Sequence, residues 1–358
     1  MRSIQYWKER SIQKSLMGER SVLDYEKLLT DAYSVALSEI TKQIYAFYQK
    51  YAADNKITYA EARKRLTALE VKEFRALLKK WYEAAVSAGV SDKHLKELKK
   101  LENQVYIARL ESLETSIKQE IEILKANQHK SMTELLSINY LAAHYISNYD
   151  TIQGMEVAVN FAKVDRLGVE TAIKTRWNKR NYSDSIWTDK DKLISTLEKV
   201  IPQSFSRGLR SDKLGDMIAK ELNTSKNRSR ALARTEVNYI SNQADLEVYK
   251  LIGIDSYEYL ATLDMRTSEI CRSMDGFIGK VSQVEVGINY PPLHPNCRST
   301  TIPHFEDEDV VERVARNQQG ETITVPRRMN QEEWINKYAP EEDREKLLKF
   351  IKKYGKTT

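Results

Sequence analysis

The chain has 358 residues and a formal net charge of +6, with 41% hydrophobic and 30% charged residues. This composition is typical of a soluble globular protein with a substantial core, and no apolar run approaches the roughly 20 residues of a membrane span. Two cysteines exclude a disulfide-rich secreted scaffold. The N-terminal "MRSIQYWKERSIQKS" lacks the apolar centre of a signal peptide, so we expect the protein to be made and kept in the cytoplasm.

Helices are predicted over most of the first 162 residues, where glycine and proline are scarce. Apolar side chains recur every three or four residues from Leu29 to Tyr51, which indicates one helical stripe. Thr58 and Glu61 form a capping box for a second helix that stops near Gly89. This region is therefore predicted to be a succession of amphipathic helices.

Two further caps are predicted in the same region. Ser91 can cap a third, long helix, and Ser131 with Glu134 repeats the capping box before "LLSINYLAAHYI". The stripes could pair with a partner as a coiled coil, but packing within the chain is the commoner arrangement and is favoured here.

The middle of the chain is basic. Residues 163–234 hold 17 Lys/Arg and 9 Asp/Glu, whereas residues 235–305 hold 5 and 9. A helix ending at Gly208, a short helix capped by Ser211 and a further helix ending at Gly253 are predicted. The excess of positive charge indicates either a polyanion-binding segment or a solvated helix face, and the residues leave both open.

A change of period follows Gly253. Tyr257, Tyr259, Ala261 and Leu263 alternate with other residues, as in a half-buried strand, and Asp275-Gly276 predicts a turn. The fold class is thus mainly α: a long helical N-terminal region (1–162), a module at 163–305 and a charged C-terminal tail (306–358). The module combines basic helices at 163–253 with a small α+β part at 254–305, and the tail closes with an amphipathic helix.

The segment "PPLHPNCRST" (291–300) gathers rare residues. Cys271, His294 and Cys297 suggest zinc, whose sites usually have four ligands, and Asp264 or His304 could supply the fourth. Paired CxxC ligands are missing, however. A Cys271–Cys297 disulfide is an alternative that a reducing cytoplasm opposes until particles leave the cell.

Catalytic interpretations of the same residues are weaker. A nucleophilic cysteine would need a base beside it, and "HPNC" in a proline-bound turn need not bring the two side chains together. A metal-dependent nuclease could use Asp264, Glu269, Asp275 and His294, but no recognised spacing supports it.

A structural clasp is favoured over these alternatives. His294 can hydrogen-bond to Asp264 or to backbone, and Arg266 and Arg298 can pair with Glu236 or Asp264. The helix segment "ARTE" (233–236) would join the clasp. On this interpretation the motif residues hold the fold.

The order and separation of "ALARTEVNYISNQA", "YLATLDMRTSEICRSMDG" and "PPLHPNCRST" resemble the phage minor head protein family, the head-morphogenesis family typified by the Mu F-type protein. "YSDSIWTDKDKLISTLEKVI" and "SRGLRSDKLGDMIAKEL" resemble the preceding segment in Gram-positive phage and prophage members, so the likeness covers about 165–305. The family's Arg-Thr-Glu falls on Arg234, Thr235 and Glu236, and its Asp-x-Arg on Asp264 and Arg266. Its first cysteine falls on Cys271, its turn glycine on Gly276, and its His-Pro-x-Cys-Arg on His294, Pro295, Cys297 and Arg298. Many members carry a second cysteine in each motif, a zinc-like set, where this chain has Met274 and Ser299.

The resemblance implies a virion protein without enzymatic activity or a required cofactor, located inside the head or at the portal vertex and in the host cytoplasm during assembly. It implies association with the portal protein and other head proteins, self-association as an option, and roles in head assembly, DNA packaging or ejection. The alternative is a metal-dependent nuclease or other hydrolase built on the 264–298 motifs. A DNA-binding regulator is disfavoured because no recognition helix is evident. Contact with phage double-stranded DNA would be non-specific, and its candidate residues are Lys179, Arg180, Lys226, Arg228 and Arg230.

Overall fold

The computed structural model describes most of the chain: residues 2–53, 56–104, 106–155, 164, 166–262, 264, 266–305, 335–336, 339 and 341–355. The predicted fold class is confirmed, since these residues are mainly α-helical with one small sheet. Four long helices dominate: α1 (Ile4–Tyr51), α5 (Arg109–Met155), α7 (Tyr182–Ser206) and α8 (Ser211–Ile252). No helix in this described part is both long and apolar enough to cross a membrane.

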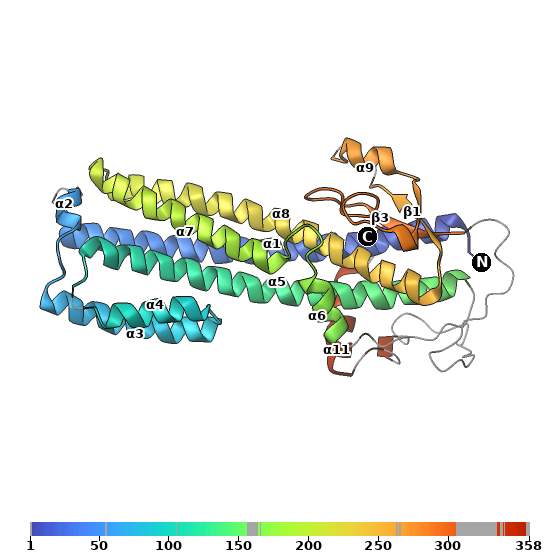
Figure 1. Cartoon of the computed structure of the whole chain (residues 1–358), viewed down its shortest axis with the longest axis horizontal. Coiled ribbons are helices and arrows are strands. Elements are labelled where there is room, and N and C mark those ends of the chain that lie inside the picture. Colours follow the sequence, from blue (N-terminus) through green and yellow to red (C-terminus); the bar gives the residue numbers. More distant parts are fainter. Residues whose placement is uncertain are drawn as a thin grey trace. The chain divides into compact units, whose positions relative to one another are not determined.

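Shorter elements complete the described fold. The helices are α2 (Tyr59–Ala62), α3 (Ala68–Ala88), α4 (Asp92–Glu102), α6 (Arg166–Lys174), α9 (Glu269–Met274), α11 (Glu341–Tyr354) and the 3-10 turn η1 (Val281–Gln283). The strands are β1 (Ser256–Leu260), β2 (Ile278–Lys280) and β3 (Thr300–His304). Figure 1 shows the order of these elements along the chain.

The single helix predicted from Thr58 to Gly89 is wrong, because two helices occupy that stretch. The Thr58–Glu61 capping box is present but begins only α2, and a second box at Thr67 and Glu70 begins α3. Between them the chain leaves the helix to pair with the residues before α5: Leu66 N donates to Ile107 O at 2.9 Å. Gly89 ends α3 in the left-handed region, at φ +71°.

Two later cap predictions also need correction. Ser91 does cap a helix, accepting from His94 N at 3.4 Å, but α4 ends at Glu102 and α5 is separate. The Ser131–Glu134 capping box is wrong, since Ser131 lies inside α5. Its hydroxyl donates to the Asn127 carbonyl at 3.0 Å, a back-bond that serine makes within a helix.

Residues 211–252 form one helix where two were predicted. The buried stripe of Leu214, Ile218 and Leu222 continues through small buried residues at Ser225 and Ser229, so nothing interrupts α8. Gly208 follows α7 at φ +61°, and Gly253 follows α8 at φ +76°, as expected for helix-ending glycines.

The contacts divide the chain into two compact units. The first unit comprises Met1–Tyr25, Met132–Tyr182 and Ala231–Thr358, and the second comprises Glu26–Ser131 and Ser183–Arg230. The boundary predicted at 162/163 falls outside the described ranges and the one at 305/306 falls where a described range ends, so both stay predictions.

In the second unit, α3 and α4 lie against each other (Figure 1) over a core that includes Phe74, Leu78 and Leu98. A lysine is fully buried in the same unit. Lys125 on α5 reaches Asp189 of α7 at 2.7 Å, and the neighbouring oxygens come from α1, α5 and α8. They are Tyr33, Gln128, Ser225 and Ser229.

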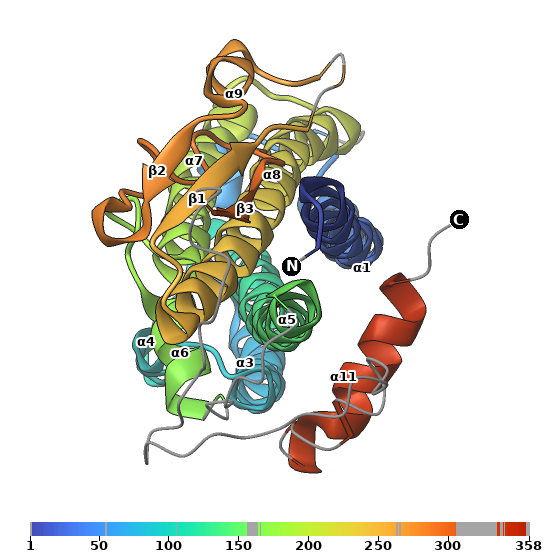
Figure 2. The same ribbon diagram turned by 90° about the vertical axis from the view of Figure 1, so that its right-hand side faces the viewer.

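In the first unit the three strands form an antiparallel sheet of order β2-β1-β3, visible in Figure 2. The prediction of a half-buried strand is wrong: Ser256 to Tyr259 are all buried, because both faces of β1 are covered. Ala261 lies beyond the strand, and Leu263 lies outside the described residues. One face packs in a tyrosine-rich core of Leu246, Tyr249, Ile254, Tyr257, Val281 and Tyr290.

The ring of Tyr257 lies against Gly279 on β2. A Cβ atom built on Gly279 would lie 2.6 Å from the Tyr257 ring, closer than side chains tolerate. The same ring places its hydroxyl 2.9 Å from the Asn289 carbonyl, just before the two prolines. Glycine therefore lets the ring cross β2 and hold the loop that follows.

The predicted amphipathic helix of the tail is present as α11, with Leu347 and Phe350 buried. It contacts α1 through Asp24, which accepts hydrogen bonds from Lys353 Nζ at 2.8 Å and Tyr354 OH at 3.1 Å. Residues 306–334 of the predicted tail lie outside the described residues.

Candidate functional site

Three sequence motifs meet in the first unit. The sheet register pairs Leu260 with Thr300, which places the chain after β1 beside the chain before β3. Thr262 then donates to the Arg298 carbonyl at 3.0 Å. From α8, the Thr235 hydroxyl accepts a hydrogen bond from Asn296 N at 2.9 Å. The fold thus brings together "ARTE", the segment around Cys271 and "HPNCRST".

Cys271, His294 and Cys297 form one cluster. Cys271 Sγ lies 3.1 Å from His294 Nε2 and 3.6 Å from Cys297 Sγ, and all three ligand atoms lie within 4.8 Å of one another. Both cysteines are buried and reduced. Ser268, the N-cap of α9, accepts from Cys271 N and has its hydroxyl 2.8 Å from His294 Nε2.

The two thiols do not titrate alike. A hydrogen bond from Cys297 lowers the pKa of Cys271 to about 4, helped by hydrogen bonds from Ser268, Ser299 and Tyr259 and opposed by burial. The same hydrogen bond and burial raise the pKa of Cys297. The hydrogen bond between the two thiols therefore favours ionisation of Cys271 over ionisation of Cys297.

The donor set suits zinc. With Zn–S bonds of about 2.3 Å, two sulfurs of a tetrahedral site lie about 3.8 Å apart, close to the 3.6 Å separation here. The Pro295 carbonyl accepts a hydrogen bond from His294 Nδ1 at 2.8 Å, which orients the ring with Nε2 toward Cys271. Among the described residues the group holds three such donors.

Neither expected fourth ligand belongs to this group. Asp264 accepts two hydrogen bonds from Arg298, at 2.6 and 2.5 Å, and His304 pairs with Ser256 at the end of the sheet. Met274 packs against the cluster, whereas the buried Ser299 contributes a hydrogen bond to Cys271. The site is thus a three-donor cluster with serine hydroxyls around it.

The Arg298–Asp264 pair is the polar centre of the proposed clasp. Hydrogen bonds from Arg298 hold the pKa of the Asp264 carboxyl well below its usual range, with further help from the Arg266 backbone and Thr267. Arg266 Nη2 lies farther from Asp264, at 3.7 Å. His294 does not bond to Asp264, since its ring nitrogens face Ser268, Cys271 and the Pro295 carbonyl.

Glu236 does not pair with either Arg266 or Arg298. It is buried on α8, where Trp177 Nε1 donates to it at 3.5 Å, and burial raises its pKa to about 7. Trp177 itself stacks on Tyr239, with ring centroids 5.1 Å apart. This indole was not singled out from the sequence, where nothing marked it as a partner of Glu236.

Backbone geometry accounts for the remaining motif residues. Gly276 adopts φ +78° and donates its N–H to the Tyr259 carbonyl at 2.9 Å, in the turn predicted at Asp275-Gly276. Pro295 supplies the carbonyl that orients His294, and the Pro291–Pro292 bond is cis. Ser268 and Tyr259 were missed as site residues. The spacing of Ser268 three positions before Cys271 is a helix-cap pattern that could have indicated the serine.

The candidate DNA-contact residues are distributed over both units. Lys179 and Arg180 are exposed in the first unit, in the segment between α6 and α7. In the second unit, Arg228 forms an ion pair with Asp189, and Arg230 donates to Thr30 Oγ1 at 2.8 Å. Lys226 is half-buried on α8. The exposed pair in the first unit is therefore better placed for a ligand than Arg228 or Arg230.

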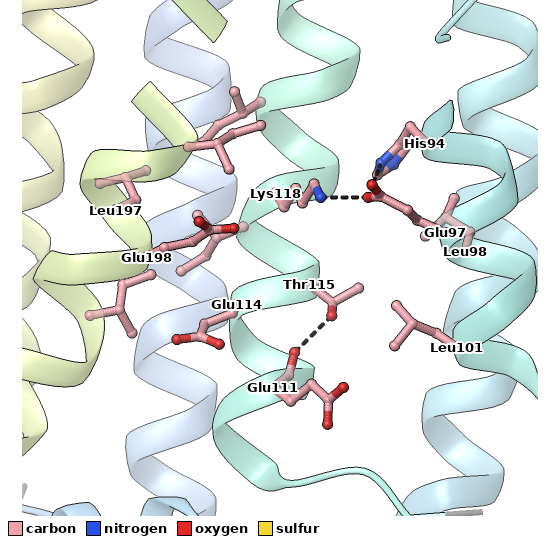
Figure 3. Close-up of a pocket in the computed structure, with 14 residues that line it drawn as sticks. His94, Glu97, Leu98, Leu101, Glu111, Glu114, Thr115, Lys118, Leu197 and Glu198 are labelled. Atoms are coloured by element: carbon pink, nitrogen blue, oxygen red, sulfur yellow. Dashed lines mark hydrogen bonds and ion pairs between the residues drawn. The ribbon is translucent and has the colours of Figure 1, made fainter. Parts of the chain in front are cut away.

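A separate cavity of about 180 Å³ lies in the second unit between α4, α5 and α7 (Figure 3). Lys118 pairs with Glu97 across it at 2.5 Å, and leucine and isoleucine side chains form much of its wall. Burial, and then the charges of Glu198 and Glu111, raise the pKa of Glu114 to about 7. Among the described residues these carboxylates do not gather into a metal-binding group.

Comparison with known proteins bears on the module that holds the cysteine cluster. Residues 195–302 match the family model described as Phage Mu protein F like protein. The Minor head protein GP7 of Bacillus phage SPP1 is 27% identical over 292 residues, which cover 76% of this chain and 91% of that protein. No solved structure matches the chain.

Proposed function

We propose, on the premise that this chain is a phage minor head protein, as both comparisons support, that it does structural work at the portal vertex or inside the head. A head protein is a component of the virion and has other head proteins as partners. We propose more specifically that the chain associates with the portal during assembly in the host cytoplasm and acts in DNA packaging or ejection. Self-association is a further option within this role.

The main support for this proposal is that the motif side chains form hydrogen bonds to other residues of the same module. Arg298 is held by Asp264, Thr235 by the Asn296 backbone, and His294 by Pro295 and Ser268. Side chains engaged in this way stabilise one arrangement of loops, and they leave few groups to act on a substrate. A structural role therefore explains the motif better than the metal-dependent nuclease does.

A phage knockout with complementation tests the proposal. Particles made without this protein should be fewer, lack normal DNA content or fail to infect, and the full chain supplied from a plasmid should restore them. Mass spectrometry of purified particles should find the chain in low copy beside the portal. Purified particles that lack the chain, made by wild-type phage, would refute the proposal.

Zinc is the ion that Cys271, His294 and Cys297 would hold, and it would act there as a structural cross-link between α9 and the loop before β3. We propose that the clasp holds without it, because Arg298 and Asp264 already join the same segments. Metal analysis of the full chain purified without chelators decides this point. A stoichiometric zinc content that is lost in Cys271→Ser, together with a lower Tm, would overturn the metal-free clasp.

We further propose that Lys179 and Arg180 contact the backbone of packaged DNA. Both are exposed and follow Trp177, whose ring stacks on Tyr239, so the loop can present two positive charges next to a fixed side chain. Such contact would be non-specific and would weaken steeply with salt. Fluorescence anisotropy with a random duplex at rising salt measures it, and the absence of binding at low salt would remove the DNA role alone.

A further inference from the structure

A groove of about 250 Å³ opens in the first unit between α1, α8 and the loop before β3. The α1 positions that line it are spaced by one and three residues, which places them on one helical face. Gly18 lies at its floor, where a Cβ atom would lie 3.3 Å from Val237 of α8. The lining residues used below are Glu19, Leu23, Arg234, Asn242, Arg266 and Arg298.

The rim of the groove is rich in arginine. Arg234 comes from α8, Arg298 precedes β3, and Arg266 follows β1 with its side chain 78% exposed. Asp264 takes both hydrogen bonds of Arg298 but lies 3.7 Å from Arg266. These three guanidinium groups face two carboxylates, those of Asp264 and Glu19, so the formal charges leave an excess of one positive charge. The rim therefore favours a negatively charged occupant.

The floor carries an acceptor that has no donor. Asn242 is 2% exposed, and its Oδ1 has no hydrogen-bond partner, although its Nδ2 donates to the Asn238 carbonyl at 2.9 Å. Buried acceptors of this kind are usually satisfied in the working state of a protein.

An apolar ledge borders the groove along α1. Ile12, Leu16 and Leu23 are 47%, 39% and 53% exposed, and their spacing places them on one stripe of the helix. Leu23 belongs to both the ledge and the groove. An occupant can thus bury apolar side chains on α1 while its charged groups meet the arginines.

We infer that this groove binds a short acidic segment of a partner head protein, with apolar side chains on the ledge and carboxylates at Arg266 and Arg234. DNA fits less well, because its sugar-phosphate backbone has nothing apolar for Leu16 or Leu23. The inference rests on the proposed function, which supplies head proteins as partners.

Photo-crosslinking in assembling particles tests this inference. The full chain carries p-benzoylphenylalanine in place of Leu23, and a matched variant carries it in place of Leu28, which is 63% exposed on the same helix outside the groove. After irradiation, cross-linked peptides are identified by mass spectrometry. We expect Leu23 to give at least tenfold more cross-linking than Leu28, to one segment of another head protein that contains Asp or Glu.

Charge reversal provides the second arm. Arg266→Glu, at an exposed position, should reduce the cross-link at least tenfold without changing the circular dichroism spectrum. A lysine introduced at the partner's carboxylate should restore it. Cross-links to DNA, to a second copy of this chain or to a basic segment would overturn the inference, as would equal yields at the two positions. If the chain is absent from particles the proposed function fails, whereas a chain that is incorporated but not cross-linked at Leu23 refutes the groove alone.

Discussion

Replacing Asp189 by asparagine should strongly destabilise the second unit. Lys125 is fully buried, and Asp189 is the carboxylate that balances its charge at 2.7 Å. Burial alone would raise the pKa of Asp189, but Lys125, Ser225 and Arg228 together lower it. Asp189→Asn leaves the Lys125 ammonium buried with only neutral oxygens around it.

The expected loss follows from that isolated charge. Removing one partner of a buried ion pair costs about 3–5 kcal/mol, a large share of the 5–15 kcal/mol that typically stabilises a folded protein. With a urea m-value of about 1–3 kcal/mol per molar, the midpoint should fall by about 1 M or more. Because the folded pKa of Asp189 is depressed, its stabilising contribution is complete above the unfolded pKa. That contribution is lost as pH falls through the lower, folded value.

Urea denaturation at pH 7 measures this change, and hydrogen exchange of α7 peptides assigns it to the second unit. The matched control is Lys125→Met combined with Asp189→Asn, which removes both charges. Its stability should lie well above the sum of the single losses, since pairs replaced together are often close to neutral. A cost below about 1 kcal/mol for Asp189→Asn, or losses that simply add, would refute the reasoning.

Three further predictions concern the first unit. Burial raises the pKa of Glu236 to about 7, so its ionisation should lower the stability of the fold as pH rises from the pKa of the unfolded chain through 7. In thermal melts from pH 4 to 8, Glu236→Gln should therefore reduce the dependence of Tm on pH. Asp264→Asn should speed hydrogen exchange in residues 262–268, and wild type should show the same change only below the ordinary Asp pKa; unchanged exchange would argue against the clasp. Lys179→Glu with Arg180→Glu should reduce the salt slope of DNA binding by about 2, whereas Lys220→Glu, on the exposed side of α8, should change it by less than 1.

The stretches of helix were predictable because buried side chains repeat every three or four residues. The ends of the helices were harder to predict, because the same motif occurs both at the start of a helix and inside one. Thr58 and Ser131 both precede a glutamate by three residues. Thr58 caps α2, whereas Ser131 bonds back within α5. Only the tertiary pairing of Leu66 with Ile107 decides where the chain leaves the helix between α2 and α3.

The composition of the candidate site was predictable, but its pairing was not. Rare residues in ordered motifs indicated Cys271, His294 and Cys297, which the fold does bring together. Arg298 could have paired with Glu236 or Asp264, and the sheet register decides for Asp264 by aligning β1 with β3. The groove between α1 and α8 joins residues more than 200 positions apart, a distance that no local pattern can bridge.

The contact between Tyr257 and Gly279 makes the module less tolerant of substitution at Gly279 than at the two cysteines. Cys271 and Cys297 could be exchanged for other small buried residues, at the loss of their thiol chemistry, because Arg298 and Asp264 would still join the two segments. Even one methyl group at Gly279 would displace the Tyr257 ring and with it the hydrogen bond to Asn289. A divergent relative could therefore lose both cysteines and keep this architecture. Almost any substitution of Gly279 would disturb it, although Gly279 touches neither cysteine.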